Sequence, residues 1–290
     1  MTSSAHSRSH RTSILLMLGS AACFITNVLL IRALGGLGNM SVWVIVCARF
    51  LVGLTLVGTL YRRDFQPSHL FTNPKLVERG ILGGICTLGF YYTVTALGAG
   101  RATFINNTYV VWGALFAVWA LRERLRPALL GGAVVTLVGL GLLTNPFANG
   151  THTGFLDAFA LLNALGAAGI VVTIRQLHAR EHTSTSFAAQ CVYGLLVCGV
   201  PAALHPSPIA GWVPWLLGGA GVTAAVGQLS MTRAFRDLPV AEGSLLQMLT
   251  PLGVAPGSVL FFQERFSPHE LVGAALIVAA CRGVRAAGSD

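Results

Sequence analysis

The sequence predicts an all-α membrane protein, with ten transmembrane helices arranged as two inverted repeats of five. Three observations predict it: apolar segments long enough to cross a bilayer, an uneven distribution of positive charge between their connections, and an internal repeat. The composition requires lipid as the solvent, because charged residues make up 10% and hydrophobic residues 54% of the 290 residues. That leaves too little polar surface to cover a water-soluble domain.

The apolar segments each approach the length of about 20 residues that a helix needs to cross the hydrocarbon. They cover residues 13–34, 40–61, 79–98, 102–121, 128–145, 154–175, 186–205, 210–231, 242–262 and 269–287. Residues 1–12 then form a cytoplasmic tail, residues 13–145 the first repeat and residues 154–287 the second. The basic N-terminus resembles a signal peptide, but apolarity continues past Cys23 through Leu30, so we expect a retained span.

Positive charges indicate the orientation of these spans. If the N-terminus is cytoplasmic, alternation places on the cytoplasmic side fifteen of the nineteen Lys and Arg residues: Arg8, Arg11, Arg62, Arg63, Lys75, Arg79, Arg122, Arg124, Arg126, Arg175, Arg180, Arg233, Arg236, Arg282 and Arg285. The bias predicts that both termini are cytoplasmic. This bias also explains the net charge of +9. The sequence contains no basic run interleaved with aromatic residues, so we expect no nucleic-acid partner.

The internal repeat appears when the chain is shifted by 141 residues against itself. Residues 123–133 then align with residues 264–274, and six of the eleven positions are identical, among them Glu123-Arg124 with Glu264-Arg265 and Pro127 with Pro268. Each half carries five spans, an odd number, so the second half enters the membrane in the opposite sense. Such inverted repeats predict a binding site near the bilayer midplane, between the halves.

These Glu-Arg corners resemble those of the drug/metabolite transporter superfamily, specifically its ten-span EamA-type carriers. Arg49-Phe50 in the second span and Pro251, thirteen residues before Glu264, also match that family. The resemblance covers essentially the whole chain. It implies transport of amino acids, their metabolites, sugars or nucleotide derivatives by a multi-pass protein of the bacterial inner membrane, often outward.

One departure from the family pattern concerns the fourth span. The proline that is usual there would fall at Val110, in the sequence Asn106-Asn107-Thr108-Tyr109-Val110. Pro251 removes a backbone hydrogen bond in the ninth span. We therefore expect the fourth span to lack a kink and the two halves to bend unequally.

Polar side chains inside the apolar spans are the candidate substrate-binding residues, because they are costly in hydrocarbon and usually face a cavity or a partner. The richest cluster is in the fourth span, where Asn106 and Asn107 offer amide donors and acceptors, and Tyr109 and Trp112 offer aromatic walls. Hydrogen bonding between neighbouring spans is the alternative role.

The ninth span carries matching polar groups. The 141-residue offset places Asn106 opposite Gln247 and Tyr109 opposite Thr250, and Ser244 shares a helix face with Gln247. A pocket shared by both halves requires such matched depth. Further candidates for substrate contact are Tyr91 and Tyr92 in the third span and Gln228 in the eighth.

Two arginines and one proline complete the predicted site. Arg49 lies near the middle of the second span and needs an acceptor, water or an anionic ligand, whereas its repeat counterpart is the neutral Gln190. Arg49 either binds a substrate carboxylate or braces the bundle. Arg101 opposes the dipole at its helix start, so it acts in gating or reaches the interface; Pro251 is the second candidate for gating.

Other classes of protein fit less well. No Asp or Glu lies near the centre of a span and no deep cluster of histidines and acids forms, so neither a proton-coupled exporter of cationic drugs nor an intramembrane enzyme is expected. The six cysteines show no CxxC or Cys/His spacing, so neither a metal nor another cofactor is predicted. A channel would require a filter loop or a pore ring.

The sequence therefore predicts a secondary transporter that exports amino acids or related small polar metabolites by alternating access. The alternatives are an exporter of drugs or toxic compounds and a carrier of nucleotide- or sugar-type metabolites. Its partners are a small-molecule substrate and the lipid bilayer. The oligomeric state is left open, with a monomer among the alternatives.

Overall fold

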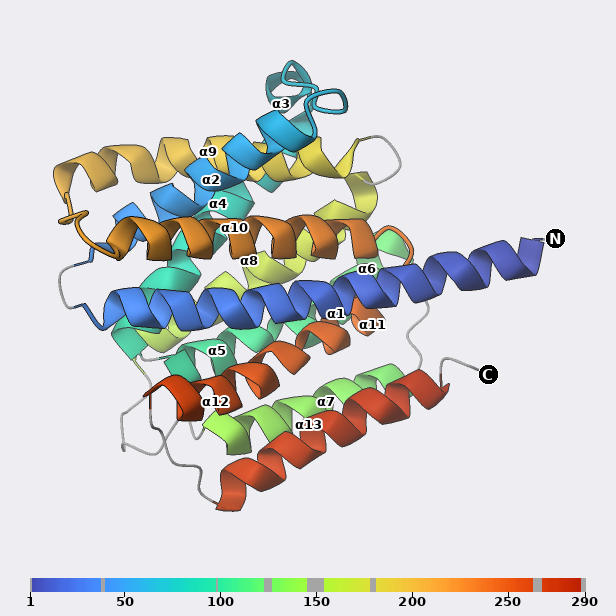
Figure 1. The fold of residues 1–290 in the computed structure, drawn as a ribbon. Coiled ribbons are helices and arrows are strands. Elements are labelled where there is room, and N and C mark those ends of the chain that lie inside the picture. The colour runs from blue at the N-terminus through green and yellow to red at the C-terminus, as the bar shows by residue number, and fades with distance from the viewer. Residues whose placement is uncertain are drawn as a thin grey trace.

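Figure 1 shows the computed structural model, which describes residues 2–37, 40–97, 99–122, 127–144, 154–177, 181–262 and 268–287. Every regular element among these residues is a helix, which confirms the all-α prediction. Five helical stretches of the described chain are long and apolar enough to cross a membrane: His10–Gly35, Val42–Leu60, Phe104–Leu121, Phe155–Leu177 and Thr183–Leu204. The number of crossings and their orientation remain predictions.

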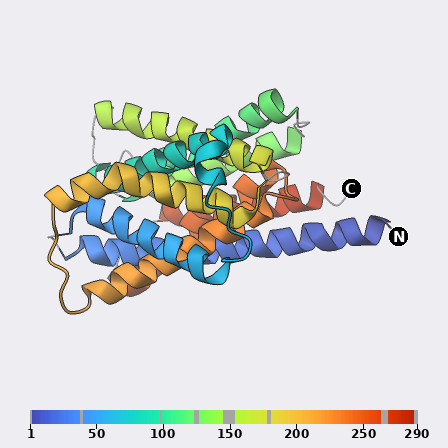
Figure 2. The same cartoon turned by 90° about the horizontal axis from the view of Figure 1, so that it is seen from above.

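The helices coincide with the ten predicted apolar segments, two of which are each divided into two helices. In the first half they are α1 (Thr2–Gly35), α2 (Val42–Leu60), the short α3 (His69–Thr72), α4 (Pro74–Leu97), α5 (Ala99–Asn107), α6 (Tyr109–Leu121) and α7 (Pro127–Thr144). In the second half they are α8 (Phe155–Leu177), α9 (Thr183–Leu204), α10 (Val213–Ala234), α11 (Val240–Gln247), α12 (Leu249–Phe262) and α13 (Pro268–Ala287). Seen from above, most of these helices run along one common direction (Figure 2).

The first helix starts earlier than the apolar pattern suggests. Residues 2–12, which we expected to form a tail, are the first turns of α1, and this end of the helix projects beyond its neighbours (Figure 1). The reason is local, because neither proline nor glycine occurs before Gly19 to end a helix. These residues therefore extend α1 beyond the apolar segment, and their place in a cytoplasmic tail stays a prediction.

Pairs of contacting helices correspond to each other under the 141-residue offset. α1 packs against α10 and α8 packs against α4, and likewise α2 packs against α10 and α9 against α4. α7 and α13, which the offset relates to each other, form a pair. Glycines permit the closest approaches: a side chain at Gly84 would meet Gly194 of α9 at 2.8 Å, and one at Gly139 would meet the Gly273 carbonyl at 2.7 Å.

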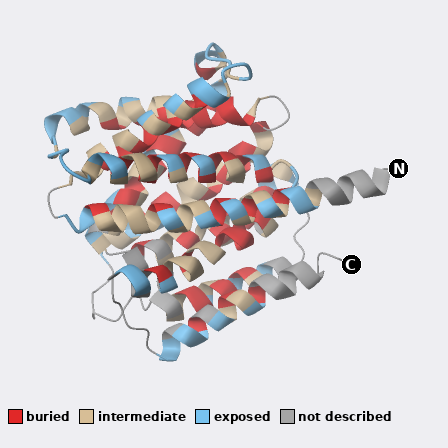
Figure 3. Ribbon diagram, in the orientation of Figure 1, coloured by how far each residue is buried: buried red, intermediate tan, exposed pale blue. Residues whose placement is uncertain are grey.

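Three groups of buried apolar residues hold the bundle together. The largest joins α2, α4, α9 and α10, and contains Phe50 and Phe187. The second and third surround α6 and α11, with Phe235 and Met248 among their members. Figure 3 shows buried residues concentrated within the bundle and exposed ones on its outer helices and at helix ends. Large apolar side chains such as Trp119 and Leu51 are among the exposed ones, as expected of helices surrounded by lipid.

Candidate functional site

The fourth and ninth predicted spans are both interrupted, at positions that the repeat relates to within one residue. α5 ends at Asn107 and α6 begins at Tyr109, whereas α11 ends at Gln247 and α12 begins at Leu249. Thr108 therefore separates the first pair of helices, and Met248 the second. Both residues keep right-handed helical backbone angles, and each amide donates to the carbonyl three residues earlier, so each interruption is one tightened turn.

The fourth span is interrupted although it lacks the proline of the family pattern. The Thr108 hydroxyl donates a hydrogen bond of 2.7 Å to the Ile105 carbonyl, and the Thr108 amide donates to the same oxygen. A side chain that competes in this way with the helical hydrogen-bond ladder can interrupt a helix without proline. In the second half, Pro251 has no amide hydrogen to offer the Gln247 carbonyl. Two different residues thus produce the same break.

Polar side chains of the fourth span contact the second half of the chain. The Asn163 amide of α8 donates to the Asn106 side-chain oxygen at 3.3 Å, and Asn107 is buried. The Tyr109 phenol lies beside the Ser244 hydroxyl of α11, which is buried and has no partner with hydrogen-bond geometry among the described residues. These side chains therefore lie between the halves. The Trp112 side chain, one turn further along α6, is partly exposed.

Gln247 lies at the end of α11, where the ninth span is interrupted. Its amide nitrogen donates to the Ser20 hydroxyl of α1 at 2.8 Å, and Ser20 donates in turn to the Gly227 carbonyl of α10 at 2.7 Å. Thr250 donates to the Gln247 side-chain oxygen at 3.3 Å. This chain of bonds joins the interrupted span to α1 and α10, and all but Thr250 belong to buried residues.

Arg49 belongs to a second polar chain, which includes one further predicted residue. Its guanidinium donates to the Tyr91 hydroxyl at 3.1 Å and lies 5.6 Å from the centre of the Tyr91 ring. Tyr91 donates to the Asn27 side-chain oxygen at 3.3 Å, and the Asn27 amide donates to the Ala220 carbonyl at 2.7 Å. Four helices, α1, α2, α4 and α10, thus meet at this arginine.

The remaining predicted site residues take no part in these two chains of hydrogen bonds, or their side chains lie outside the described residues. The Tyr92 side chain is 49% exposed, and its ring contacts the Phe159 ring edge-on. Gln228 is buried in α10, next to Gly227. Pro251 is buried in the first turn of α12. Arg101 lies in α5, but its side chain is outside the described part of the structure.

Polar contacts also connect the two halves near the start of α4 and the end of α8. The Glu181 carboxylate accepts a hydrogen bond of 2.8 Å from Asn73 and lies 3.2 Å from His69 Nδ1. We call these three residues the Glu181 clamp. Lys75 donates to the Gln176 side chain at 2.9 Å beside it. The clamp joins the connection between α2 and α4 to the connection between α8 and α9.

Further contacts hold the N-terminal part of α1 and the end of α8 against the turn between α10 and α11 and the first turn of α11. The Ser13 hydroxyl donates to Asp237 at 3.0 Å, and His10 lies 3.3 Å from Glu242. The Arg175 guanidinium donates to three backbone carbonyls of that turn, each at 3.0 Å. These carbonyls come after the end of α10, where a positive charge is favourable.

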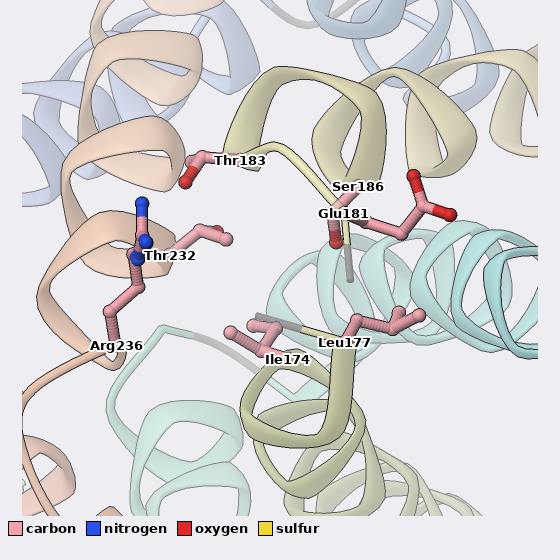
Figure 4. Close-up of a pocket in the computed structure, with 7 residues that line it drawn as sticks. All are labelled: Ile174, Leu177, Glu181, Thr183, Ser186, Thr232 and Arg236. Atoms are coloured by element: carbon pink, nitrogen blue, oxygen red, sulfur yellow. The ribbon is translucent and has the colours of Figure 1, made fainter. Parts of the chain in front are cut away.

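A small pocket lies behind the clamp, where α8, α9 and α10 approach one another (Figure 4). It is lined by Ile174, Leu177, Glu181, Thr183, Ser186, Thr232 and Arg236. Its volume of about 10 Å³ is close to that of one water molecule. It is therefore too small for a metabolite, and it lies apart from the two interrupted spans.

Several residues of these networks were not singled out from the sequence. Ser20, the partner of Gln247, is a small hydroxyl in an apolar segment, and nothing in its sequence context predicts that contact. Arg79 was assigned to a cytoplasmic connection, whereas its side chain is fully buried. Its neighbour Gln190 was noted only as the counterpart of Arg49. Among the described residues, no group of three or more His, Cys, Asp or Glu could hold a metal ion.

Comparison with known proteins gives a consistent family assignment. The model of the EamA-like transporter family matches residues 11–145 and, a second time, residues 154–285. The pseudopaline exporter CntI of Pseudomonas aeruginosa is 26% identical over 245 residues, covering 82% of this chain and 84% of the exporter. An uncharacterized transporter of Helicobacter pylori is 21% identical and covers 57% of both chains. A protein crystal structure, 20% identical, shares the fold, with a TM-score of 0.72 over 97% of this chain and 96% of the other.

Proposed function

The chain belongs to the EamA-like transporter family, and we propose that it exports amino acids or related small polar metabolites across the bacterial inner membrane. The family and its exporter relatives indicate a transporter and not an enzyme. A membrane-embedded protein with a small-molecule substrate follows directly from that membership. The substrate, the direction of transport and the topology are parts of the proposal.

The proposed architecture is ten spans in two inverted repeats, residues 13–145 and 154–287, with both termini cytoplasmic. The two separate matches to the family model support the division. The exchangeable packing of α1 with α10 and of α8 with α4 supports a two-fold relation between the halves. The concentration of Lys and Arg in alternate connections supports the orientation.

The two interrupted spans are the observation that carries the proposal of a midplane substrate site. Transporters built from inverted repeats typically bind substrate where discontinuous helices meet. Here the interruptions at Thr108 and Met248 match under the repeat to within one residue, and Asn106 and Gln247 lie beside them. Both side chains are hydrogen-bonded to other helices. A substrate that entered would exchange these bonds for its own.

Alternating access requires that one end of the path be closed while the other opens. We propose that the Glu181 clamp and the contacts of Arg175 close the cytoplasmic end. The clamp joins the two halves at the end where α4 and α9 begin, and Arg175 ties α8 to the turn after α10 within the second half. Opening that end would require these hydrogen bonds to break together.

Amides, hydroxyls and aromatic rings suit the carboxylate and ammonium groups of an amino-acid-like metabolite. That the pseudopaline exporter is similar over most of its length supports outward transport of a small metabolite. A drug or toxic-compound exporter and a nucleotide- or sugar-type carrier are the alternative functions. A channel fits less well, because inverted halves suit rocking between two closed states.

Transport into proteoliposomes tests the proposal. A panel of labelled amino acids should include at least one with saturable flux, measured with and without a pH gradient. Asn106→Ala and Gln247→Ala should each lower that flux roughly tenfold, the effect of losing one or two hydrogen bonds of about 1 kcal/mol. Thr55→Ala is the matched control, because that hydroxyl is exposed and bonds only its own helix.

Two results would contradict the proposal in different ways. Absence of saturable flux for every amino acid would remove the substrate class. Unaltered kinetics in both the Asn106 and the Gln247 variants, with flux intact, would place the substrate site elsewhere in the molecule.

A further inference from the structure

One face of α4 carries a row of residues four positions apart that contact polar groups of α2 and α9. The row consists of Arg79, Gly83, Thr87 and Tyr91, and we call it the polar row of α4. Residues at this spacing lie one above another on a helix. The Gln190 amide of α9 donates to the Gly83 carbonyl at 3.3 Å and to the Thr87 hydroxyl at 3.0 Å. The row therefore forms a continuous polar path through a predominantly apolar core.

An arginine stands at each end of this row. Arg79 donates to the Gln190 side-chain oxygen at 3.1 Å, and Arg49 donates to the Tyr91 hydroxyl at 3.1 Å. Arg79 is fully buried and Arg49 is 8% exposed. The Cys191 thiol of α9 is within electrostatic reach of both guanidinium groups. Two permanent positive charges thus share one buried region.

Neither arginine has a carboxylate partner in the described part of the chain. Nε and Nη1 of Arg79 and Nε of Arg49 are buried without a hydrogen-bond acceptor there. The sequences of α2 and α9 contain no Asp or Glu, and Glu78, which precedes Arg79, is exposed. An arginine stays charged in a protein, and an isolated buried charge costs several kcal/mol. An anion is what this arrangement lacks.

Neighbouring glycines leave the space that the Arg79 side chain occupies. A side-chain carbon at Gly83 would lie 2.4 Å from Arg79 Nη1, so only glycine allows the guanidinium to rest against the helix at this point. Gly84 and Gly194 let α4 and α9 approach closely at the same depth. The guanidinium is therefore held between two helices of opposite halves, rather than extending to the membrane surface as a long basic side chain usually does.

We propose that the polar row of α4 is an anion subsite, in which Arg79 and then Arg49 receive a carboxylate of the transported substrate. This inference rests on the proposed function and narrows its substrate class to metabolites with net negative charge. A neutral zwitterion would leave the second guanidinium uncompensated. Because Arg79 lies at a contact between the halves, movement of α4 against α9 would open and close the subsite.

Thermal stability of the purified full-length protein in detergent tests the subsite. In two pairs of probes, carboxylates stand in place of amides: one in glutamate compared with glutamine, and two in succinate compared with succinamide, all at equal ionic strength. In at least one pair the acid should stabilise the protein at a concentration at least about tenfold lower than its amide, as expected for charge-assisted hydrogen bonds. Arg79→Gln should reduce that ratio to less than about twofold, whereas the exposed Arg63→Gln should preserve it.

A second variant keeps the test decisive if Arg79→Gln does not fold. Gln190→Glu places a carboxylate where the 3.1 Å acceptor of Arg79 now is. It should raise the melting temperature without ligand and remove the preference for the acid, because the internal carboxylate occupies the site. If acid and amide act equally on the natural protein, or if the preference survives either variant, the subsite is wrong.

Flux measurements separate this inference from the proposed function. If no amino acid is transported, the proposed function fails, and the probe comparison still decides the subsite. If flux is present but the ratio of glutamate to glutamine transport is the same in Arg79→Gln and in the natural protein, only the anion subsite fails.

Discussion

If the Glu181 clamp closes one end of the molecule, as we propose, removing the Glu181 carboxylate should open that end. Glu181 accepts a bond of 2.8 Å from Asn73 and lies 3.2 Å from His69. A hydrogen bond to a charged acceptor contributes about 1.5–3 kcal/mol, whereas the His69 contact adds little because that side chain is 45% exposed. Glu181→Ala should therefore weaken closure by about 2 kcal/mol, which raises the open population roughly 30-fold.

A cysteine at Ser186 would report this opening. The Ser186 side chain is buried and lines the pocket behind the clamp, so Ser186→Cys should react slowly with a maleimide in detergent. Adding Glu181→Ala should accelerate the reaction by about 10- to 30-fold, since reaction requires the open state. Asn73→Ala removes the same bond without altering the pocket lining and should accelerate it several-fold. Glu78→Ala, at an exposed acid, is the control.

The reasoning would be refuted by an unchanged maleimide rate in Asn73→Ala. Acceleration in Glu181→Ala alone would mean only that the smaller side chain uncovers position 186 locally. Parallel acceleration in both variants requires that the bond between the two connections, and not the volume of one side chain, keeps this end closed.

Two other structural features lead to testable outcomes. Thr108→Val keeps the side-chain shape but removes the 2.7 Å bond to the Ile105 carbonyl. We expect proteoliposome flux to fall about fivefold, the equivalent of about 1 kcal/mol, with little change in melting temperature. Equal flux in the variant and the natural protein would show that the break does not depend on the hydroxyl. Gly84→Leu must push α4 away from Gly194, because a side-chain carbon there would lie 2.8 Å from that residue, so the melting temperature should drop by several degrees, as overpacking costs of about 1–3 kcal/mol imply. Gly58→Leu, which meets no neighbouring atom within 4 Å, is the matched control and should melt as the natural protein does; equal melting of the two variants would contradict the close crossing.

Much of the fold could be predicted because the solvent determines it. Apolar runs of nearly constant length marked the positions of the helices, and the duplicated Glu-Arg corners at residues 123 and 264 indicated the family, which the comparisons confirm. Polar residues at matched depth, Asn106 and Gln247, drew attention to the two interrupted spans. These features depend on composition and spacing along the chain, which a single sequence displays directly.

The interruption at Thr108 was missed for a specific physical reason. A helix break is predicted from proline, and position 110 carries valine where the family pattern has proline. The sequence did contain another signal, because Asn106, Asn107 and Thr108 are three consecutive side chains that can bond to the backbone in place of the helical ladder. The hydrogen-bond partners of the polar residues could not be predicted from the sequence. The bond from Gln247 to Ser20 of α1, for example, depends on how helices distant in sequence pack together.

The burial of Arg79 could not be predicted from the distribution of charges along the sequence. Its position near the start of an apolar segment placed it among the basic residues that indicate orientation, yet α4 begins at Pro74 and the side chain extends into the core toward Gly83. A residue can thus support the orientation and also occupy a buried polar row. The two arginines have no basic counterparts in the other half, because the offset relates Arg49 to Gln190 and Arg79 to Ala220. The repeat provides two similar scaffolds, and divergence at related positions concentrates the positive charge beside α4, where we propose that an anionic substrate binds.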